Sequence, residues 1–196
     1  MCKKIVIVFV GVLMALSAQA QGFKGGLHLG LLATQVDGDN HAGYKKVGLF
    51  AGAFTNYSFP EKKIQLQFEL NYAQKGSHNK TIYHIKLHQV EPTLLLNWNF
   101  WDKFWLEPGL AFNILASAKE YANRNLVPEV LGSNFYRFHL DGVVGLGFRF
   151  HEHWSSSLRY SYSLSPIGRA NKLGNGRGIS GNMFNNCLLF RLCYQF

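Results

Sequence analysis

One stretch of the sequence alternates strictly between apolar and polar side chains over nine residues. Its apolar positions are Ile64, Leu66, Phe68, Leu70 and Tyr72, and its polar positions are Gln65, Gln67, Glu69 and Asn71. Because successive side chains of a β-strand point to opposite faces, this period of two predicts a strand with one apolar and one polar face. A chain built from such strands must therefore form a sheet whose two faces meet very different surroundings.

The same alternation recurs along most of the chain. It is clear in residues 94–100, 104–114, 138–150, 154–164 and 184–196, and weaker in the Gly-rich segments of about 22–32 and 46–58. Together with 64–72, these segments make eight predicted strands. No amphipathic helix competes with them after residue 20, so we expect an all-β protein.

The lengths of the connections indicate how the strands are arranged. Short turns are predicted around residues 60–63, 102–103 and 151–153, and longer loops at about 33–45, 75–85, 119–135 and 166–182. Long and short connections alternate along the chain, as they do when all short turns lie at one end of an up-and-down barrel and all long loops at the other. The sequence therefore predicts an eight-stranded antiparallel up-and-down transmembrane β-barrel.

The composition agrees with a barrel and excludes two other classes. Charged residues make up only 16% of the chain, against roughly 25% in soluble globular proteins. The mean hydropathy is nevertheless −0.04, and no stretch after residue 20 approaches the roughly 20 consecutive apolar residues of a spanning helix, which excludes a helical membrane bundle. A hydrophobic content of 47% also argues against a disordered chain.

All four tryptophans lie next to predicted short turns. They are Trp98, Trp101, Trp105 and Trp154. Aromatic residues gathered at one level of separate strands are typical of the girdle at a membrane interface, here on the periplasmic side. The alternative is a soluble sandwich with a Trp-rich core, but its outer face would carry too many glycines and too few charges.

The first 20 residues have the features of a cleaved signal peptide. Lys3 and Lys4 precede an apolar stretch over 5–16, and Ala18-Gln19-Ala20 forms a small-x-small cleavage site. The apolar stretch is too short to span a bilayer, which disfavours an uncleaved anchor. We expect a signal peptide at 1–20 and a barrel domain at 21–196.

The polar faces of the strands carry a nearly balanced set of charges. An eight-stranded barrel has an interior that side chains fill, and buried charges are costly unless they are paired. We therefore expect an ion-pair network inside the barrel. Its predicted members are Glu69, Glu91, Glu107, Asp141, Arg149, Arg159 and Arg191, and Lys24 and His28 share the inward face of the first strand. The alternative is a proton or solute path along these charges.

The C-terminus carries a further signal. Leu192, Tyr194 and Phe196 alternate up to the last residue. This pattern resembles the C-terminal strand by which outer-membrane barrels are recognised for insertion. We therefore expect Phe196 to serve as an insertion signal and the barrel-insertion machinery to be a partner.

Short motifs along the chain resemble one family. They are Gly25–Leu29, Val36–Asp39 with Gly43-Tyr44, Glu69-Leu70 with Gln74–Gly76, Val90–Pro92 with 94–96, 115–119 (LASAK), 141–147 (DGVVGLG) and 159–162 (RYSY). In order and spacing the chain resembles the Bacteroidetes outer-membrane β-barrel family that includes PorT. The resemblance implies an eight-stranded outer-membrane barrel of a Gram-negative bacterium. Through PorT, the resemblance also implies a role in protein secretion as one alternative. It supplies no catalytic residues.

Candidate metal and catalytic patterns are weak. Asp37–Asn40 begins like a calcium loop, but Ala42 and Gly48 stand at loop positions six and twelve, where Gly and Glu are needed. His84 and His88 lie about 13 Å apart on one strand, and His151 with His153 is better explained as a solvated turn. An enzyme would need a catalytic set at the long-loop end. The available residues are His28, His41, His78, Asp37 and Ser77, and nothing in their spacing singles them out. We expect no catalytic, cofactor or metal site.

Two predicted long loops are basic. The loop at 166–182 contains Arg169, Lys172 and Arg177, the loop at 75–85 contains Lys75 and Lys80, and neither contains an acid. Such loops suit the phosphates of outer-membrane lipopolysaccharide, whereas nucleic acid is not an expected partner of an exported chain. We expect a structural or interaction protein of the outer membrane. The alternatives are a component of a secretion or envelope assembly, a narrow channel and a membrane enzyme.

Overall fold

The fold is described from a computed structural model of the chain. The structure describes residues 22–37, 43–44, 46–60, 62–78, 83–122, 125–126, 134–170 and 181–196. The predicted signal peptide at 1–20 lies outside these ranges and stays a prediction.

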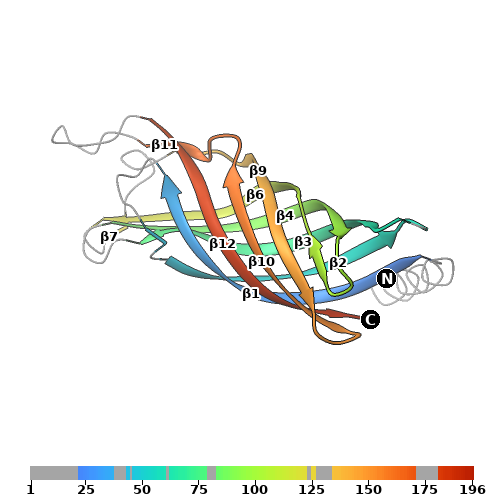
Figure 1. The fold of residues 1–196 in the computed structure, drawn as a ribbon. Coiled ribbons are helices and arrows are strands. Elements are labelled where there is room, and N and C mark those ends of the chain that lie inside the picture. Colours follow the sequence, from blue (N-terminus) through green and yellow to red (C-terminus); the bar gives the residue numbers. More distant parts are fainter. Residues whose placement is uncertain are drawn as a thin grey trace, which may run out of the picture.

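Eight long segments form a closed antiparallel ring (Figure 1). In chain order they are β1 (Phe23–Asp37), β2 (Lys46–Ser58), β3 (Ile64–His78), β4 (Tyr83–Asn99), β5 with β6 (Phe104–Leu106 and Gly109–Ala122), β9 (Phe138–Arg149), β10 (Trp154–Ser163) and β12 (Gly181–Gln195). Each segment pairs with the next, and β12 pairs with β1 from Gly26↔Gln195 to Asp37↔Phe184, which closes the ring. The predicted eight-stranded up-and-down barrel is confirmed.

One barrel strand is built from two pieces. Because Pro108 has no N–H to donate, the regular strand is interrupted at Glu107 and Pro108, between β5 and β6. The wall continues across the break, because Glu107 donates its backbone N–H to Gly145 (2.9 Å) and Pro108 accepts one from Leu96 (2.9 Å). The predicted strand at 104–114 is therefore a single barrel strand that a proline interrupts.

The connections sort to the two ends of the barrel as predicted. Tight turns at 59–63, 100–103 and 150–153 lie at one end, called here the turn end, together with the C-terminus. At the opposite, loop end, the short strands β7 (Asn125–Leu126), β8 (Asn134–Phe135) and β11 (Gly168–Ala170) extend the wall. None of the described residues belongs to a helix long and apolar enough to cross a membrane.

The strands reach further toward the loop end than the sequence pattern predicts. β3 and β4 pair as far as His78↔His84, and β6 runs to Ala122. The predicted loops at 33–45, 75–85 and 119–135 are therefore shorter than expected. Backbone pairing with β4 holds the extensions of both β3 and β6, so they do not need an alternating pattern to form.

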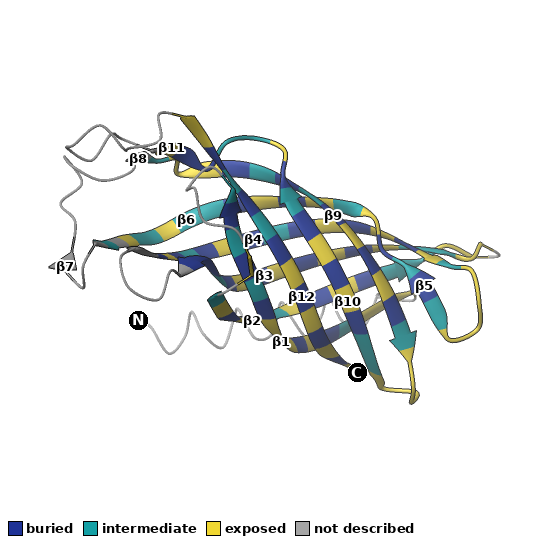
Figure 2. Cartoon of the chain, turned by 60° about the vertical axis from the view of Figure 1, so that its left-hand side comes forward, coloured by how far each residue is buried: buried dark blue, intermediate teal, exposed yellow. Residues whose placement is uncertain are grey.

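Each strand buries every second side chain inside the barrel (Figure 2). The burial of β12 alternates without interruption from Met183 to Tyr194, and that of β1 alternates from Gly26 to Asp37. The outer surface is largely apolar, with residues such as Leu29, Leu158 and Phe190 more than half exposed. A soluble monomer rarely exposes an apolar surface of this extent.

Two aromatic belts border this apolar surface. Trp98, Trp101 and Trp154 are exposed at the turn end, and their neighbours there are Phe100, Phe150, Tyr194 and Phe196. Toward the loop end, tyrosines that were not among the predicted girdle residues are exposed, among them Tyr72, Tyr136 and Tyr160.

Trp105 does not belong to the girdle, contrary to the prediction. Its side chain is 9% exposed, lies inside the barrel, and donates its indole N–H to Glu107 (3.3 Å). Trp105 and Glu107 are two residues apart in an extended segment and therefore face the same side.

Candidate functional site

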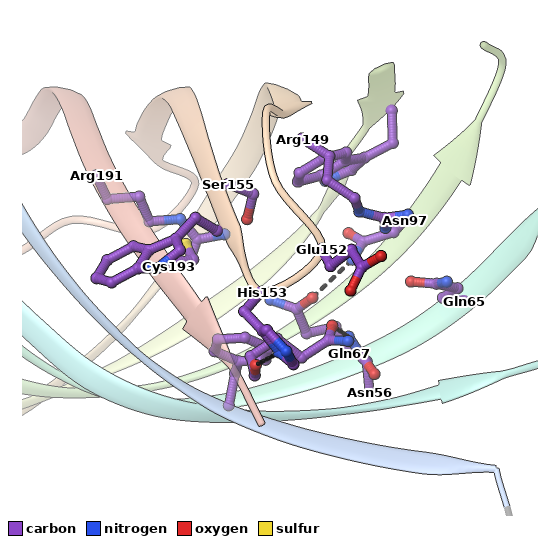
Figure 3. A pocket seen from close by; sticks show the side chains of 14 residues that line it. Asn56, Gln65, Gln67, Asn97, Arg149, Glu152, His153, Ser155, Arg191 and Cys193 are labelled. Carbon is purple, nitrogen blue, oxygen red and sulfur yellow. Dashed lines mark hydrogen bonds between the residues drawn. The ribbon is translucent and has the colours of Figure 1, made fainter. Parts of the chain in front are cut away.

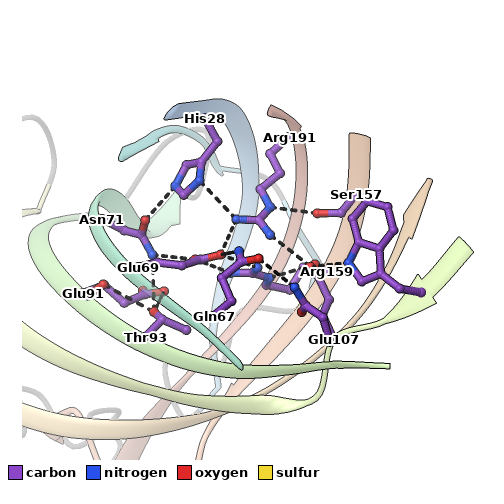
Figure 4. Close-up of polar contacts among 12 residues, drawn as sticks. His28, Gln67, Glu69, Asn71, Glu91, Thr93, Glu107, Ser157, Arg159 and Arg191 are labelled. Carbon is purple, nitrogen blue, oxygen red and sulfur yellow. Dashed lines mark hydrogen bonds and ion pairs between the residues drawn. The ribbon is translucent and has the colours of Figure 1, made fainter. Parts of the chain in front are cut away.

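Four buried side chains from four positions of the wall form an ion network near the turn end (Figure 4). Glu69 comes from β3, Glu107 from the break between β5 and β6, Arg159 from β10 and Arg191 from β12. Arg159 contacts Glu69 through both terminal nitrogens (3.0 and 3.1 Å) and Glu107 through Nε (3.2 Å). Arg191 contacts Glu69 (2.6 Å) and Glu107 (3.0 Å). Each arginine thus bridges both carboxylates, which balances two negative with two positive charges.

Neutral polar groups complete the hydrogen bonding around this ion network. Gln67 and Asn71 donate to the two oxygens of Glu69 (2.7 and 3.0 Å), and Arg191 Nε donates to Ser157 (2.8 Å). His28 joins Asn71 (2.7 Å) to Arg191 (3.3 Å). Buried charges are tolerated when their remaining donors and acceptors are satisfied in this way.

Glycines on β9 make room for the network. A Cβ at position 145 would lie 2.6 Å from a carboxylate oxygen of Glu107, and one at position 147 would lie 2.0 Å from the Trp105 ring. Only glycine leaves space for these large side chains to cross the lumen.

A second buried cluster centres on Lys75. Its ammonium group lies 2.7 Å from Glu91, 2.8 Å from Asp141 and 2.8 Å from the Asn113 side-chain oxygen. Ser163 donates to Asp141 (2.9 Å). The sequence pattern predicts that Lys75 belongs to a basic loop. This assignment is wrong, because β3 continues to His78 and the odd positions of β3 point inward.

Apolar side chains pack beside the two charged clusters and at the loop end, while neutral polar side chains link the clusters. Asn71 donates to Glu69 (3.0 Å) and to Thr93 (3.3 Å), and Thr93 donates to Glu91 (3.5 Å). On β3, Ala73 lies between Glu69 and Lys75. Its buried cluster consists of Leu32, Phe50, Ala73, Cys187 and Leu189. Another cluster lies at the loop end and consists of Val36, Ile85, Leu87, Ile167 and Met183. Charged, neutral polar and apolar side chains therefore fill the interior together along the barrel axis.

Arg149, a predicted member of the interior network, and Lys24, a residue predicted to face inward, lie elsewhere. Arg149 is exposed at the turn end of β9, with its guanidinium carbon 5.9 Å from the Trp105 ring centroid, and it takes part in none of the ion pairs among the described side chains. Lys24 is exposed at the start of β1. Both residues have the inward parity, but they stand where the strands leave the closed part of the barrel.

A small polar cavity of about 30 Å³ lies between the ion network and the turn end (Figure 3). The turn at 150–153 covers it with Glu152 and His153, and Asn56, Gln67 and Asn97 line its wall. Side-chain oxygens of Asn56 and Asn97 are buried without a protein partner. A polar cavity of this size is large enough for one or two water molecules.

The structure gives no support to the weak metal patterns. Residues 38–42 of the calcium-loop candidate lie outside the described ranges, as does the side chain of His84. The rings of His151 and His153 are 6.4 Å apart. Among the described residues, no three His, Cys, Asp or Glu side chains are grouped to hold a metal ion.

The ion network predicts a large and specific effect of removing one arginine. Arg159→Met leaves two buried carboxylates facing one cation, so we expect a loss of about 3–5 kcal/mol in the free energy of unfolding. Adding Glu107→Gln restores the charge balance and should recover part of the loss. Urea unfolding in lipid vesicles, followed by tryptophan fluorescence, measures both.

Arg149→Met is the matched control for this experiment. Because Arg149 is exposed, its replacement should cost less than about 1 kcal/mol. Equal losses for the Arg159 and Arg149 variants would contradict the assignment of the network.

The packing of Trp105 predicts a second effect. Gly147→Ala forces a methyl group into the indole ring and should destabilise the barrel by about 1–3 kcal/mol, with a shift in tryptophan emission. Gly142→Ala is the control, because the nearest atom to its Cβ is a Leu164 methyl carbon at 3.4 Å. Unfolding curves of the two variants that coincide would show that Trp105 does not pack on Gly147.

Comparison with solved structures gives the same architecture. The crystal structure of Ail, the attachment invasion locus protein of Yersinia pestis, is similar with a TM-score of 0.53 and 13% identity over 88% of this chain and 98% of that one. Ail in complex with the heparin analogue sucrose octasulfate is similar with a TM-score of 0.54 and 14% identity over 90% and 100% of the two chains. Neisserial surface protein A gives a TM-score of 0.54 with 11% identity over 90% and 98%. At these identities the likeness shows the fold.

The sequence itself identifies the family. No curated protein matches the chain significantly. The family described as outer membrane protein beta-barrel domain matches residues 18–169, which is most of the chain and includes nearly all of the barrel wall from β1 to β11. The chain therefore belongs to the outer membrane protein beta-barrel domain family and is a small outer-membrane protein.

Proposed function

We propose that this protein is a structural and interaction protein of the outer membrane, that its barrel is closed to solutes, and that it acts without catalysis. The observation that carries the proposal is the filled interior. The ion network and the Lys75 cluster occupy the lumen, Asn71 and Thr93 link them by hydrogen bonds, and buried apolar clusters pack beside them and at the loop end. A hydrated path for ions would have to disrupt both the charged clusters and the apolar packing.

Such a protein offers two exposed surfaces to partners, the apolar band of the wall and the loop end. Its apolar band contacts outer-membrane lipid, and its basic loop end suits lipopolysaccharide phosphates. Arg169 is exposed there, whereas Lys80, Lys172 and Arg177 lie outside the described residues. The predicted signal peptide and the predicted insertion signal at Phe196 support export and delivery to the barrel-insertion machinery.

A second candidate function is a place in a secretion or envelope assembly of a Bacteroidetes bacterium. The motifs that resemble the PorT-containing family support it, and two of them contain Asp141 and Arg159 of the interior clusters. Cross-linking in cells from the loop end to a secretion component would favour this candidate over a generic interaction role.

Conductance tests the closed barrel. The purified protein in a planar bilayer should show no steady conductance above that of the lipid alone, under conditions in which a general porin conducts. A single, reproducible, ion-selective conductance level would overturn the proposal and favour the narrow-channel alternative.

The insertion signal is tested by comparing two aromatic residues at the turn end. Phe196 is 69% exposed and its backbone N–H bonds to Gly25, while Phe150 is 50% exposed at the same end. We expect Phe196→Ala to slow assembly several-fold in vesicles that contain the insertion machinery, because recognition reads the last residue. Phe150→Ala should assemble at the normal rate, and assembly is measured as the gain of the heat-modifiable folded form on gels. Equal rates for the two variants would contradict the signal.

A further inference from the structure

A group of lysines at the loop end of one wall is placed where lipid head groups lie. Lys86 on β4 and Lys119 on β6 are exposed and directly opposite each other in the register of the two strands. Like charges at directly opposed positions destabilise a sheet unless something compensates them. The charges of Lys46, Lys86 and Lys119 all act on the neighbouring His88. Lys46 stands in the inward register of β2, opposite the buried Thr34, and its ammonium group lies in the wall at the Lys75 carbonyl. These three lysines are called here the outer basic cluster.

Internal contacts offset little of this repulsion. Lys86 lies over the Tyr121 ring at 5.6 Å from its centroid, and the Lys46 ammonium donates to the Lys75 carbonyl beyond the last β2–β3 pair, Phe50↔Ala73. None of the ion pairs among the described side chains includes a member of the outer basic cluster. The cluster is therefore suited to an anion that the chain itself does not provide.

The height of the cluster identifies the kind of anion. Lys86 is twelve residues from Trp98 on β4, or about 40 Å along a strand and about 30 Å along the membrane normal at a tilt near 40°. The apolar band of such barrels is about 25 Å tall and begins at the aromatic girdle, so Lys86 lies just beyond its outer edge. Phosphate groups of outer-leaflet lipids lie at this depth.

The residues between the cluster and the middle of the membrane match successive parts of a lipid molecule. Leu70, Val90 and Leu94 are exposed in the apolar band. Above them, Tyr72 bonds His88 (2.6 Å) and Gln74 (3.1 Å), which makes a polar layer at the interface. The outer basic cluster comes next, so one wall presents in order the partners of acyl chains, of the glycerol or sugar region, and of phosphate.

The opposite wall lacks this arrangement. At the loop ends of β1 and β12, Asp37 accepts hydrogen bonds from Gln35 (2.6 Å) and Asn186 (3.4 Å). The pair of opposed lysines is thus a feature of the β4–β6 wall, whereas Arg137 and Arg169 are exposed singly elsewhere at the loop end.

We propose that the wall formed by β2, β3, β4 and β6 binds one phosphorylated outer-leaflet lipid of the lipid A type, with Lys86 and Lys119 holding its phosphomonoester and Lys46 adding charge beside them. The inference rests on the proposed function, because it names the lipid partner of the exposed wall. A phosphomonoester carries up to two negative charges, which the opposed lysines can share as point charges.

Native mass spectrometry of the detergent-solubilised barrel tests the site with three probes: bisphosphorylated lipid A, dephosphorylated lipid A and inorganic phosphate. The wild-type protein should retain the phosphorylated lipid. The Lys86→Gln/Lys119→Gln variant should bind it about 10- to 30-fold more weakly. The control variant Lys62→Gln/Lys103→Gln removes two exposed lysines at the turn end and should bind as the wild type does. Heat modifiability confirms that both variants fold.

Three results would overturn the site. They are equal lipid retention by the Lys86/Lys119 variant, equal retention of the dephosphorylated lipid by the wild type, and displacement of the lipid by millimolar inorganic phosphate. Loss of lipid binding in a barrel that is still non-conducting would remove the lipid site alone, whereas conductance would remove the proposed function whatever the lipid result.

Discussion

The constraint on which the whole structure depends is that a chain crossing lipid must satisfy its backbone hydrogen bonds internally. The pairing of β12 with β1 meets this requirement, because it gives every barrel strand two neighbours. Closure also determines which side chains are apolar and which are polar, since a closed wall has one face toward lipid and one toward the lumen. The alternation seen in residues 64–72 follows from closure, and so does the near-zero mean hydropathy of a chain with so apolar a surface.

Closure with eight strands creates a second problem, which is how to fill a narrow lumen lined by polar positions. Large charged side chains reach across it, and glycines on the facing strand provide the space, as Gly145 does for Glu107. The charges of the ion network are balanced, and each of its arginines meets both carboxylates. In the Lys75 cluster one ammonium group faces two carboxylates, and hydrogen bonds from Ser163 to Asp141 and from Thr93 to Glu91 help to satisfy them.

Much of this could be predicted from the sequence, because parity along a strand is a reliable guide where the strand lies within the closed barrel. Glu69, Glu107, Arg159 and Arg191 share the inward parity and lie together. Parity also places Trp105 with Glu107, but the position of Trp105 beside a short turn suggested the girdle instead. Arg149 shows the opposite error. Its inward parity predicts a buried side chain, but at a strand end that is open to solvent the side chain is exposed.

The sequence also predicts too little strand at the loop end. The apolar alternation of β3 stops at Tyr72, which predicts a loop at Lys75, yet the strand continues to His78. Beyond the apolar band the outer face no longer needs apolar residues, so the period-two signal disappears although the backbone ladder persists. This explains why polar and basic outer residues such as Gln74 and Lys86 lie on strands that composition alone assigns to loops. It also means that the loop-end lysines are held by a rigid wall, with fixed spacing and fixed height above the band. A wall of this kind can distinguish anions by their depth in the membrane, which a mobile basic loop cannot do.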